Sequence, residues 1–183
     1  MPIAATTTLL CFVIAVSDGD TLKARCQDPR NGPDTTRVVR LASIDAPERD
    51  QPYGWRSKKT LGELTLRKPA RLVCRKKDDR YGRSLCNAWV TPATCTRSSC
   101  EFTLDAGLAM LTQGLAWWEP RFAREQTAQQ RGQYEFAQVE AKARRAGLWR
   151  DGGQAVPPWD WRRDHPGWPH AAGGAPAASS ANQ

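Results

Sequence analysis

Short apolar runs separated by turn-forming residues fill the first half of the chain. Residues 9–16 (LLCFVIAV) form one run, residues 21–26 form a second, and Ser-Asp-Gly-Asp separates them. This spacing predicts two antiparallel strands joined by a tight turn. The following residues, 27–36, contain proline, Asn-Gly and Asp, so they are predicted to form a loop. Residues 1–8 are expected to be an N-terminal extension.

Three more strands and one helix are predicted before residue 91. Residues 37–44 are rich in β-formers and end before Asp-Ala-Pro-Glu, where the proline stops the strand. Residues 54–68 place leucines among charged residues before a proline, which fits a helix. Residues 70–76 and 84–90 are predicted strands joined through 78–83 (DDRYGR).

The second half of the chain is predicted to be mostly helical. Residues 91–100 form a polar loop, 104–113 a short helix stopped by Gly114, and 121–146 a longer helix stopped by a glycine. Residues 151–183 are dominated by Pro, Gly, Ala and Ser and are expected to be an irregular or disordered tail. Short strands followed by helices indicate an α+β fold, and a small five-stranded barrel would bury strands of this length.

The composition adds a strong positive charge to this picture. The chain has 183 residues, a formal net charge of +8 and a pI near 9.5, which favours a polyanionic partner such as DNA or RNA, with simple solubility as the alternative. It fits one domain, expected to be monomeric, plus appendages. No apolar stretch reaches the roughly 18 residues of a membrane span. No Lys or Arg precedes residues 9–16, which argues against an intact secretory signal and for a buried first strand.

Three acidic residues occupy positions where a predicted strand ends in a turn: Asp20, Asp45 and Glu48. Such positions allow a scaffold to hold carboxylates in fixed geometry, and hard cations such as Ca²⁺ bind carboxylate and carbonyl oxygens. Acidic residues also favour turns for local reasons. The occurrence of Asp-Gly-Asp-Thr together with Asp-Ala-Pro-Glu nevertheless favours a metal site.

Two arginines lie close to these acids in the predicted fold. Arg40 is inside the strand that leads to Asp45, and Arg83 follows a tight turn; a guanidinium matches phosphate oxygens. A salt bridge to one of the acids is the alternative for Arg40. Both histidines, His165 and His170, lie in the predicted tail, so a catalytic triad or histidine-rich zinc centre has no source in the folded part. Carboxylates, arginines and a hard metal fit phosphodiester hydrolysis.

Four strings in order, VSDGDTLKARC, RLASIDAPE, DDRYGRSL and GLAWW, resemble staphylococcal nuclease-like proteins over residues 9–150. The resemblance implies an OB-type barrel with three helices and a Ca²⁺-dependent endonuclease that cuts DNA or RNA to leave a 3′-phosphate. It implies metal binding by Asp20, Asp45 and the carbonyl of Ala46. It also implies that Glu48 orients or deprotonates the attacking water, and that Arg40 and Arg83 bind the scissile phosphate.

Nucleotide contacts are also implied by the resemblance. Arg80 and Tyr81 match a basic and aromatic pair that contacts a terminal phosphate. Trp117 and Trp118, with Phe122 nearby, stand where the family has base-stacking tyrosines. Tryptophan also stacks on bases, but a core role for one of the two is an open alternative. The loop 91–100 is longer than the family's usual hairpin.

The six cysteines predict three disulfides. Opposed residues of an antiparallel hairpin lie symmetrically about the turn, and two cysteine pairs satisfy this symmetry, one in each predicted hairpin. The last pair shares the loop 91–100. Free buried thiols are one alternative, and a zinc site at the last pair is another. The predicted pairs are Cys11–Cys26, Cys74–Cys86 and Cys95–Cys100, which would place the protein in an oxidising compartment, secreted or periplasmic.

Two other functional classes compete with the enzyme. A non-catalytic OB-fold nucleic-acid-binding module would lack the acids and arginines, and a disulfide-stapled extracellular interaction protein would have no need of them. The five residues that the chemistry requires are all present here: Asp20, Asp45, Glu48, Arg40 and Arg83. The sequence therefore favours the nuclease.

Overall fold

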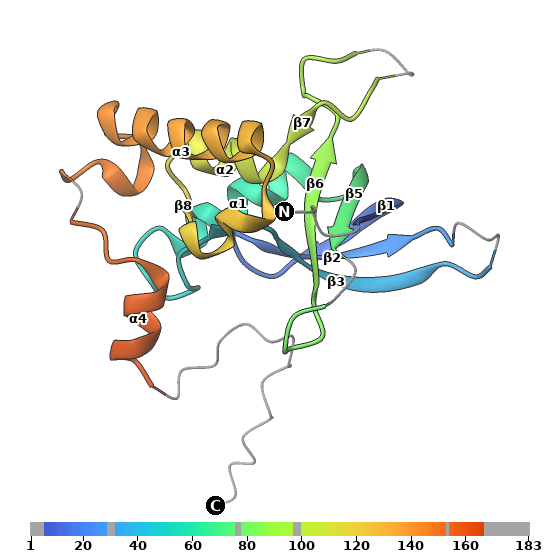
Figure 1. The fold of residues 1–183 in the computed structure, drawn as a ribbon, viewed down its shortest axis with the longest axis horizontal. Coiled ribbons are helices and arrows are strands. Elements are labelled where there is room, and N and C mark those ends of the chain that lie inside the picture. The colour runs from blue at the N-terminus through green and yellow to red at the C-terminus, as the bar shows by residue number, and fades with distance from the viewer. Residues whose placement is uncertain (1–5, 29–31, 76–77, 97–99, 153, 167–183) are drawn as a thin grey trace, which may run out of the picture.

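Five strands close into a barrel in the computed structural model, which describes residues 6–28, 32–75, 78–96, 100–152 and 154–166 (Figure 1). Antiparallel neighbours follow the order β3-β2-β1-β5-β6, and a parallel pairing of β3 with β6 closes the ring. This arrangement confirms the predicted α+β fold with an OB-type barrel. The barrel strands are β1 (Thr6–Val16), β2 (Thr21–Cys26), β3 (Thr35–Leu41), β5 (Pro69–Arg75) and β6 (Ser84–Val90).

The strand β1 begins inside the predicted N-terminal extension, because Thr6, Thr7 and Thr8 pair with β5. The first five residues of that extension lie outside the described residues. Along β1 buried and exposed side chains alternate, with Leu9 and Val13 turned inward and Leu10 largely exposed. The apolar run at residues 9–16 is therefore a barrel strand that is buried on one face only.

The strand register brings the predicted cysteine partners together. Cys11 lies opposite Cys26 and Cys74 opposite Cys86. The register of β1 and β2 shifts by one residue between Val13 and Ala15, between the turn and the cysteines, and beyond this shift Cys11 lies opposite Cys26. The three pairs at disulfide distance are Cys11–Cys26, Cys74–Cys86 and Cys95–Cys100.

Three helices lie above and beside the barrel in the view of Figure 1: α1 (Gly54–Thr65), α2 (Ala106–Thr112) and α3 (Ala128–Ala143). The helix predicted at 121–146 is shorter, because Thr127 and Gln130 form a capping box that starts α3. Two 3₁₀ helices, Pro120–Glu125 and Gly147–Trp149, flank it. The short strands are β7 (Leu104–Asp105), which extends the sheet beside β6, and the pair β4 (Ile44–Asp45) and β8 (Trp117–Trp118).

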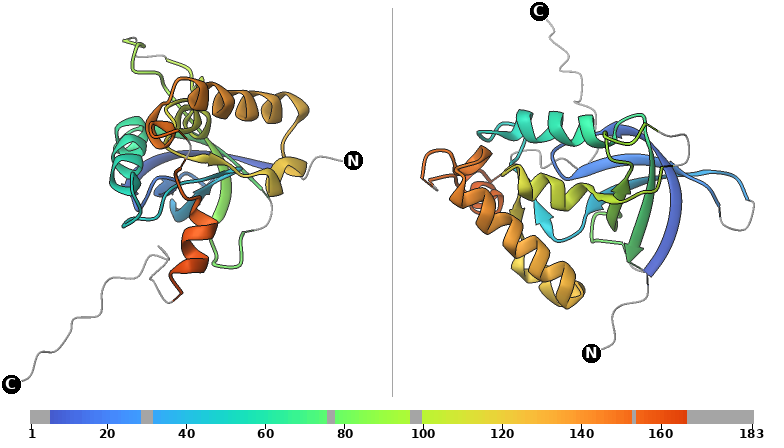
Figure 2. Two further views of the ribbon diagram at one scale, coloured as in Figure 1. Left: turned by 90° about the vertical axis from the view of Figure 1, so that its left-hand side faces the viewer. Right: turned by 90° about the horizontal axis from the view of Figure 1, so that it is seen from above.

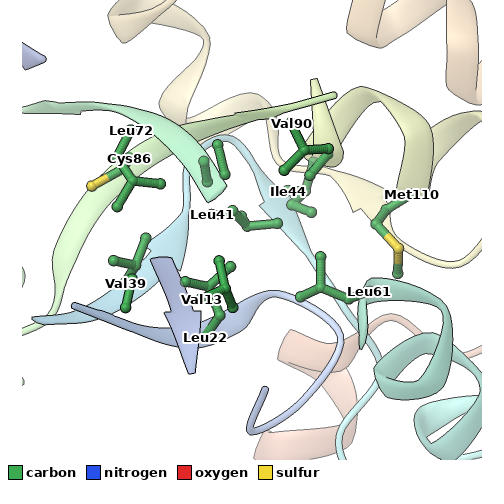
Figure 3. Close-up of a cluster of buried hydrophobic side chains, with 14 of the residues drawn as sticks. Val13, Leu22, Val39, Leu41, Ile44, Leu61, Leu72, Cys86, Val90 and Met110 are labelled. Carbon is green, nitrogen blue, oxygen red and sulfur yellow. The ribbon is translucent and has the colours of Figure 1, made fainter. Parts of the chain in front are cut away.

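The main core fills the barrel and extends to α1 and α2. Every second residue of each barrel strand points inward, as the pleat of a strand requires. Leu61 of α1 and Met110 of α2 close this core from the helical side (Figure 3). Tyr134 brings α3 to it, with its hydroxyl donating to Asp105 at 2.8 Å. The strands that carry the candidate acids therefore rest on a fully packed core.

One further helix, α4 (Pro158–Asp164), lies in the segment that was predicted to be an irregular tail. It stands apart from α1, α2 and α3, below them in Figure 1 and in the left view of Figure 2. A proline at the first helical position and Asp160 in the first turn favour helix initiation there. The part of the predicted tail beyond residue 166 lies outside the described residues. Within the described residues, no helix is long and apolar enough to cross a membrane.

Candidate active site

The three predicted residues Asp20, Arg40 and Asp45 meet at one guanidinium. A single nitrogen of Arg40, Nη2, lies 3.1 Å from Asp20 Oδ2 and 2.9 Å from Asp45 Oδ1. Its other terminal nitrogen donates to the carbonyls of Leu41 and Ile44, both at 2.8 Å. Arg40 in β3 lies opposite Thr21, and its side chain points toward the start of β2 and toward β4. The salt bridge that was the alternative for Arg40 is thus present, and it involves both candidate ligands.

The Asp-Gly-Asp-Thr string at the end of β1 holds Asp20 in place. Asp18 Oδ1 accepts the N–H of Asp20 at 3.1 Å, and Thr21 donates its hydroxyl to Asp20 Oδ1 at 2.9 Å. The N–H of Ala46 donates to Asp20 Oδ2 at 2.7 Å, so the β4 loop lies against this carboxylate. Gly19 has no room for a side chain, because a Cβ there would collide with Ser57 and with Ala46.

Burial and charge shape the ionisation of these groups. Burial raises the pKa of Asp20 to about 6, although Arg40 and the Ala46 N–H favour its charged form. Burial also raises the pKa of Asp45, against the opposing effects of Arg40 and Arg162. Burial opposes the charge of Arg40, but Asp20 and Asp45 raise its pKa. Burial therefore opposes the charged form of both aspartates more strongly than their arginines favour it.

The side chain of Glu48 contacts a residue that the sequence did not predict for this site. Arg162 of α4 donates from Nη1 to Glu48 Oε1 at 2.7 Å and from Nη2 to Asp45 Oδ2 at 2.6 Å. The backbone of Glu48 is fixed separately, because its N–H donates to Gln51 Oε1 at 3.0 Å. One guanidinium from the C-terminal helix thus joins two of the predicted site residues.

The turn between β5 and β6 forms the opposite wall and holds Arg83, Arg80 and Tyr81. Asp79 organises this turn, since it accepts the N–H groups of Tyr81 and Arg83 and the Nε of Arg83, at 2.8–2.9 Å. The guanidinium of Arg80 lies 4.8 Å from the centre of the Tyr81 ring, and that of Arg83 lies 5.3 Å from it. Gly82 takes a positive φ of 73° that the tight turn requires.

Both walls line a single open cleft with a volume of 720 Å³. Its lining includes every residue that was predicted for metal binding, catalysis and terminal-phosphate contact: Asp20, Asp45, Ala46, Arg40, Glu48, Arg83, Arg80 and Tyr81. The lining also includes Arg121 and Phe122 from the 3₁₀ helix and Trp159, Arg162 and Arg163 from α4. Acids gather on the barrel side and arginines surround them, which suits a phosphate held beside a cation.

The structure places Trp117 in a hydrophobic core, which is the alternative that the sequence left open for one of the two tryptophans. Trp117 is only 4% exposed and packs edge-on against Trp149 and Trp159, with ring centroids 5.5 and 6.5 Å apart. Trp118 is half-buried against the main core, and its Nε1 donates to Gln126 at 3.0 Å. Neither tryptophan lines the cleft. Trp117 belongs to a second hydrophobic cluster with Ala141, Leu148 and Trp149, whereas Trp118 stays with the main core.

The residues that sequence reasoning missed are Arg162, Trp159 and Asp79. The first two lie in the segment whose composition suggested a tail, although Pro-Pro followed by Trp-Asp-Trp-Arg-Arg carries a helix-start signal. Asp79 lies inside the quoted string DDRYGRSL, three residues before the turn glycine Gly82, and Asp is a common acceptor in turns. Both signals could be found without a structure.

Comparison with known proteins decides the family. The family model described as staphylococcal nuclease homologue matches residues 38–151. The chain belongs to the staphylococcal nuclease family. The match ends before α4 begins, so the family model does not extend to Arg162.

Relatives of this nuclease-family protein occur among bacterial proteins. An uncharacterized endonuclease of Haemophilus influenzae is 35% identical over 153 residues, which cover 84% of this chain and 72% of the relative. A protein named micrococcal nuclease from Shigella flexneri is 36% identical over 151 residues, 82% of this chain and 79% of the relative. Protein ParB of Escherichia coli is 37% identical over 156 residues, 83% and 78% respectively.

The acidic wall fits a hard cation by the chemistry of its donors. Within the described ranges, no group of three or more His, Cys, Asp or Glu side chains is spaced as a metal cluster. The predicted site of this family member needs only two carboxylates and a main-chain carbonyl, so it would not form such a group. The raised pKa of Asp20 reflects buried negative charge, which a bound cation would stabilise.

Proposed function

We propose that this protein is a metal-dependent endonuclease that hydrolyses phosphodiester bonds of DNA or RNA. The single observation that carries the proposal is the convergence of Asp20, Arg40 and Asp45 at one guanidinium nitrogen, inside a cleft whose far wall presents Arg83. A non-catalytic binding module has no use for two carboxylates buried against one arginine. The nuclease names of the relatives support the same conclusion.

Asp20, Asp45 and the carbonyl of Ala46 would hold the metal ion, which we propose to be Ca²⁺. An all-oxygen donor set favours Ca²⁺ over Zn²⁺. The bound ion would polarise the phosphate and lower the pKa of water in the cleft. Asp20 is held for this role by Thr21 and Ala46, and Asp45 by Arg40.

The protein's own groups would divide the remaining work. Glu48 orients the attacking water and accepts its proton as oxygen bonds to phosphorus. The bond from phosphorus to the 5′ oxygen breaks, the leaving oxygen takes up a proton from water, and the phosphate stays on the 3′ side. Arg40 and Arg83 stabilise the charge that develops on the phosphate oxygens. Arg80 and Tyr81, on the exposed turn, contact a terminal phosphate or the adjacent nucleotide.

We also propose that the three cysteine pairs are disulfides and that the protein works in an oxidising compartment, outside the cell or in the periplasm. Support comes from two independent hairpins in which the strand register opposes the cysteines. The described residues contain no free cysteine. The proposal requires that the denatured, unreduced protein contain no titratable thiol.

A cleavage assay tests the function. Purified protein is incubated with single-stranded DNA, duplex DNA and RNA, with Ca²⁺ or with excess chelator, and the product ends are identified. Cleavage that requires Ca²⁺ and leaves 3′-phosphates is expected. Asp45→Ala should abolish cleavage while the circular dichroism spectrum is unchanged. Full cleavage in excess chelator would contradict the metal site, and binding without any cleavage would identify a binding module.

A further inference from the structure

The C-terminal helix α4 reaches into the cleft of the barrel domain through one side chain. Arg162 contacts Glu48 at 2.7 Å and Asp45 at 2.6 Å, across 114 and 117 residues of sequence. Its side chain is 30% exposed, against 68% for the neighbouring Arg163, which contacts only Asp160 and Asp164 of its own helix among the described residues. Both arginines line the cleft, but Arg162 pairs with its acids and Arg163 pairs with acids of its own helix.

Several contacts anchor α4 so that Arg162 points into the cleft. Trp159 packs edge-on against the buried ring of Trp117, at 6.5 Å between centroids. Pro158 is buried at the start of the helix. Gln51 donates from Nε2 to the carbonyl of Val156 and accepts the N–H of Glu48. The loop that carries Glu48 and the segment that leads into α4 are therefore joined at two points, one through Gln51 and one through Arg162.

The side chain of Glu48 depends on this arginine for its orientation. Among the residues that the structure describes, Arg162 is the one partner of the Glu48 carboxylate. Asp45, in contrast, is also held by Arg40. A glutamate carboxylate without a partner would sample several rotamers, whereas a charge-assisted bond to an anchored guanidinium selects one of them. Groups that orient a catalytic residue in this way are commonly worth roughly 10- to 100-fold in activity.

We propose that Arg162 is a positioning residue of the active site, which holds the Glu48 carboxylate beside Asp45 for its work on the attacking water. The inference rests on the proposed nuclease function. It places α4 inside the catalytic unit rather than in a tail, because the geometry of Glu48 is completed from this helix. In this role Arg162 sets only the orientation of the Glu48 carboxylate, and the roles proposed for the barrel residues stay the same.

The test compares Arg162→Gln with Arg163→Gln, which removes the same charge from the same helix. Arg163 also lines the cleft, but its ion pairs are with Asp160 and Asp164 rather than with Asp45 or Glu48, so kcat is the readout that separates the two variants. For Arg162→Gln we expect kcat to fall roughly 10- to 100-fold, while KM changes by less than about 3-fold. Arg163→Gln should keep the wild-type kcat. Calorimetric Ca²⁺ affinity should not fall in Arg162→Gln, since the change removes a positive charge beside Asp45. Thermal melts of both variants monitor folding, and Arg162→Lys provides a second substitution that keeps the charge.

A double substitution separates positioning from other roles. If Arg162 acts through Glu48, the variant Arg162→Gln with Glu48→Gln should be no slower than Glu48→Gln alone. Additive losses would overturn the proposal, and so would weaker Ca²⁺ binding in step with kcat. A rise in kcat for Arg162→Gln would also overturn it, because Arg162 would then obstruct the cleft. If Glu48→Gln alone keeps full activity, the proposed function of Glu48 fails, which is a different result from the failure of Arg162.

Discussion

On the barrel side of the cleft, Asp20 and Asp45 are 5% and 3% exposed, and both contact Arg40. On the opposite wall, Tyr81 is 56% exposed, and the carboxylate of Asp79 organises the turn. The buried wall is fixed by backbone and side-chain bonds from three strands, and its charges are costly to hold. The exposed wall is a short turn, and forming it costs less free energy than holding the buried charges of the barrel wall. The difference indicates that the barrel wall supplies preorganised chemistry and that the turn supplies contacts with substrate.

The sharpest way to test this division compares lysine at Arg40 with lysine at Arg83. Each change keeps the charge but loses the planar two-point fork, and each should lower kcat by about 10²-fold, the scale for one transition-state donor. Only Arg40→Lys should also weaken Ca²⁺ binding and lower the melting temperature, because Arg40 holds Asp20, Asp45 and two carbonyls. Turnover, Ca²⁺ calorimetry and melts measure the three effects. Equal changes in metal affinity for both variants would remove the distinction between the walls.

The next test measures how much the buried carboxylate of Asp20 lowers the free energy of unfolding when no metal is bound. The folded pKa of Asp20, about 6, is above its ordinary 3.8, so the stability associated with this carboxyl is fully present below pH 3.8 and is lost as the pH rises through 6. In excess chelator at pH 8, Asp20→Asn should therefore raise the free energy of unfolding by about 1–3 kcal/mol. Denaturant melts of both proteins measure this difference. At pH 4 it should nearly vanish, and an equal gain at both pH values would contradict the electrostatic origin.

The smallest effect is expected on the exposed wall. Tyr81→Ala removes a ring that lies under Arg80 and Arg83, and an exposed cation–π contact is worth about 0.5–1 kcal/mol. We expect KM to rise roughly 2- to 5-fold, with kcat nearly unchanged. Tyr81→Phe keeps the ring and serves as the control, with wild-type kinetics expected. A large fall in kcat for Tyr81→Ala would show that the turn takes part in the chemistry.

Most of the barrel could be predicted from the sequence because its strands alternate between the core and solvent. The cysteine pairs were predicted from their symmetric positions about each hairpin turn, and the strand register opposes Cys11 to Cys26 beyond the shift between Val13 and Ala15. The start of α3 was predicted too early, since the capping box at Thr127 and Gln130 lies inside a continuous run of helix-forming residues. A capping box is a weak sequence signal for a helix start when the residues before it also have a high helix propensity.

The candidate site could be predicted only where its residues form short local strings. Asp20, Asp45 and Arg83 each lie in a string whose spacing indicates a turn beside a strand, and the structure brings them to one cleft. The placement of Trp117 and Arg162 depends on tertiary contacts between distant segments. Composition predicted an irregular tail around Arg162, and nothing local shows that Trp117 faces Trp149. Burial of such residues follows from packing, which a single sequence does not display.

The contacts of Arg162 with Asp45 and Glu48 link segments 117 and 114 residues apart, and this separation has a consequence during synthesis. A chain emerges from the ribosome from its N-terminus, at about 5–20 residues per second, and domains fold as they appear. The barrel can therefore form several seconds before α4 is available to it. During that interval the nascent protein has its carboxylates in place but lacks the guanidinium that joins them, so the last adjustment of the cleft follows the folding of everything around it.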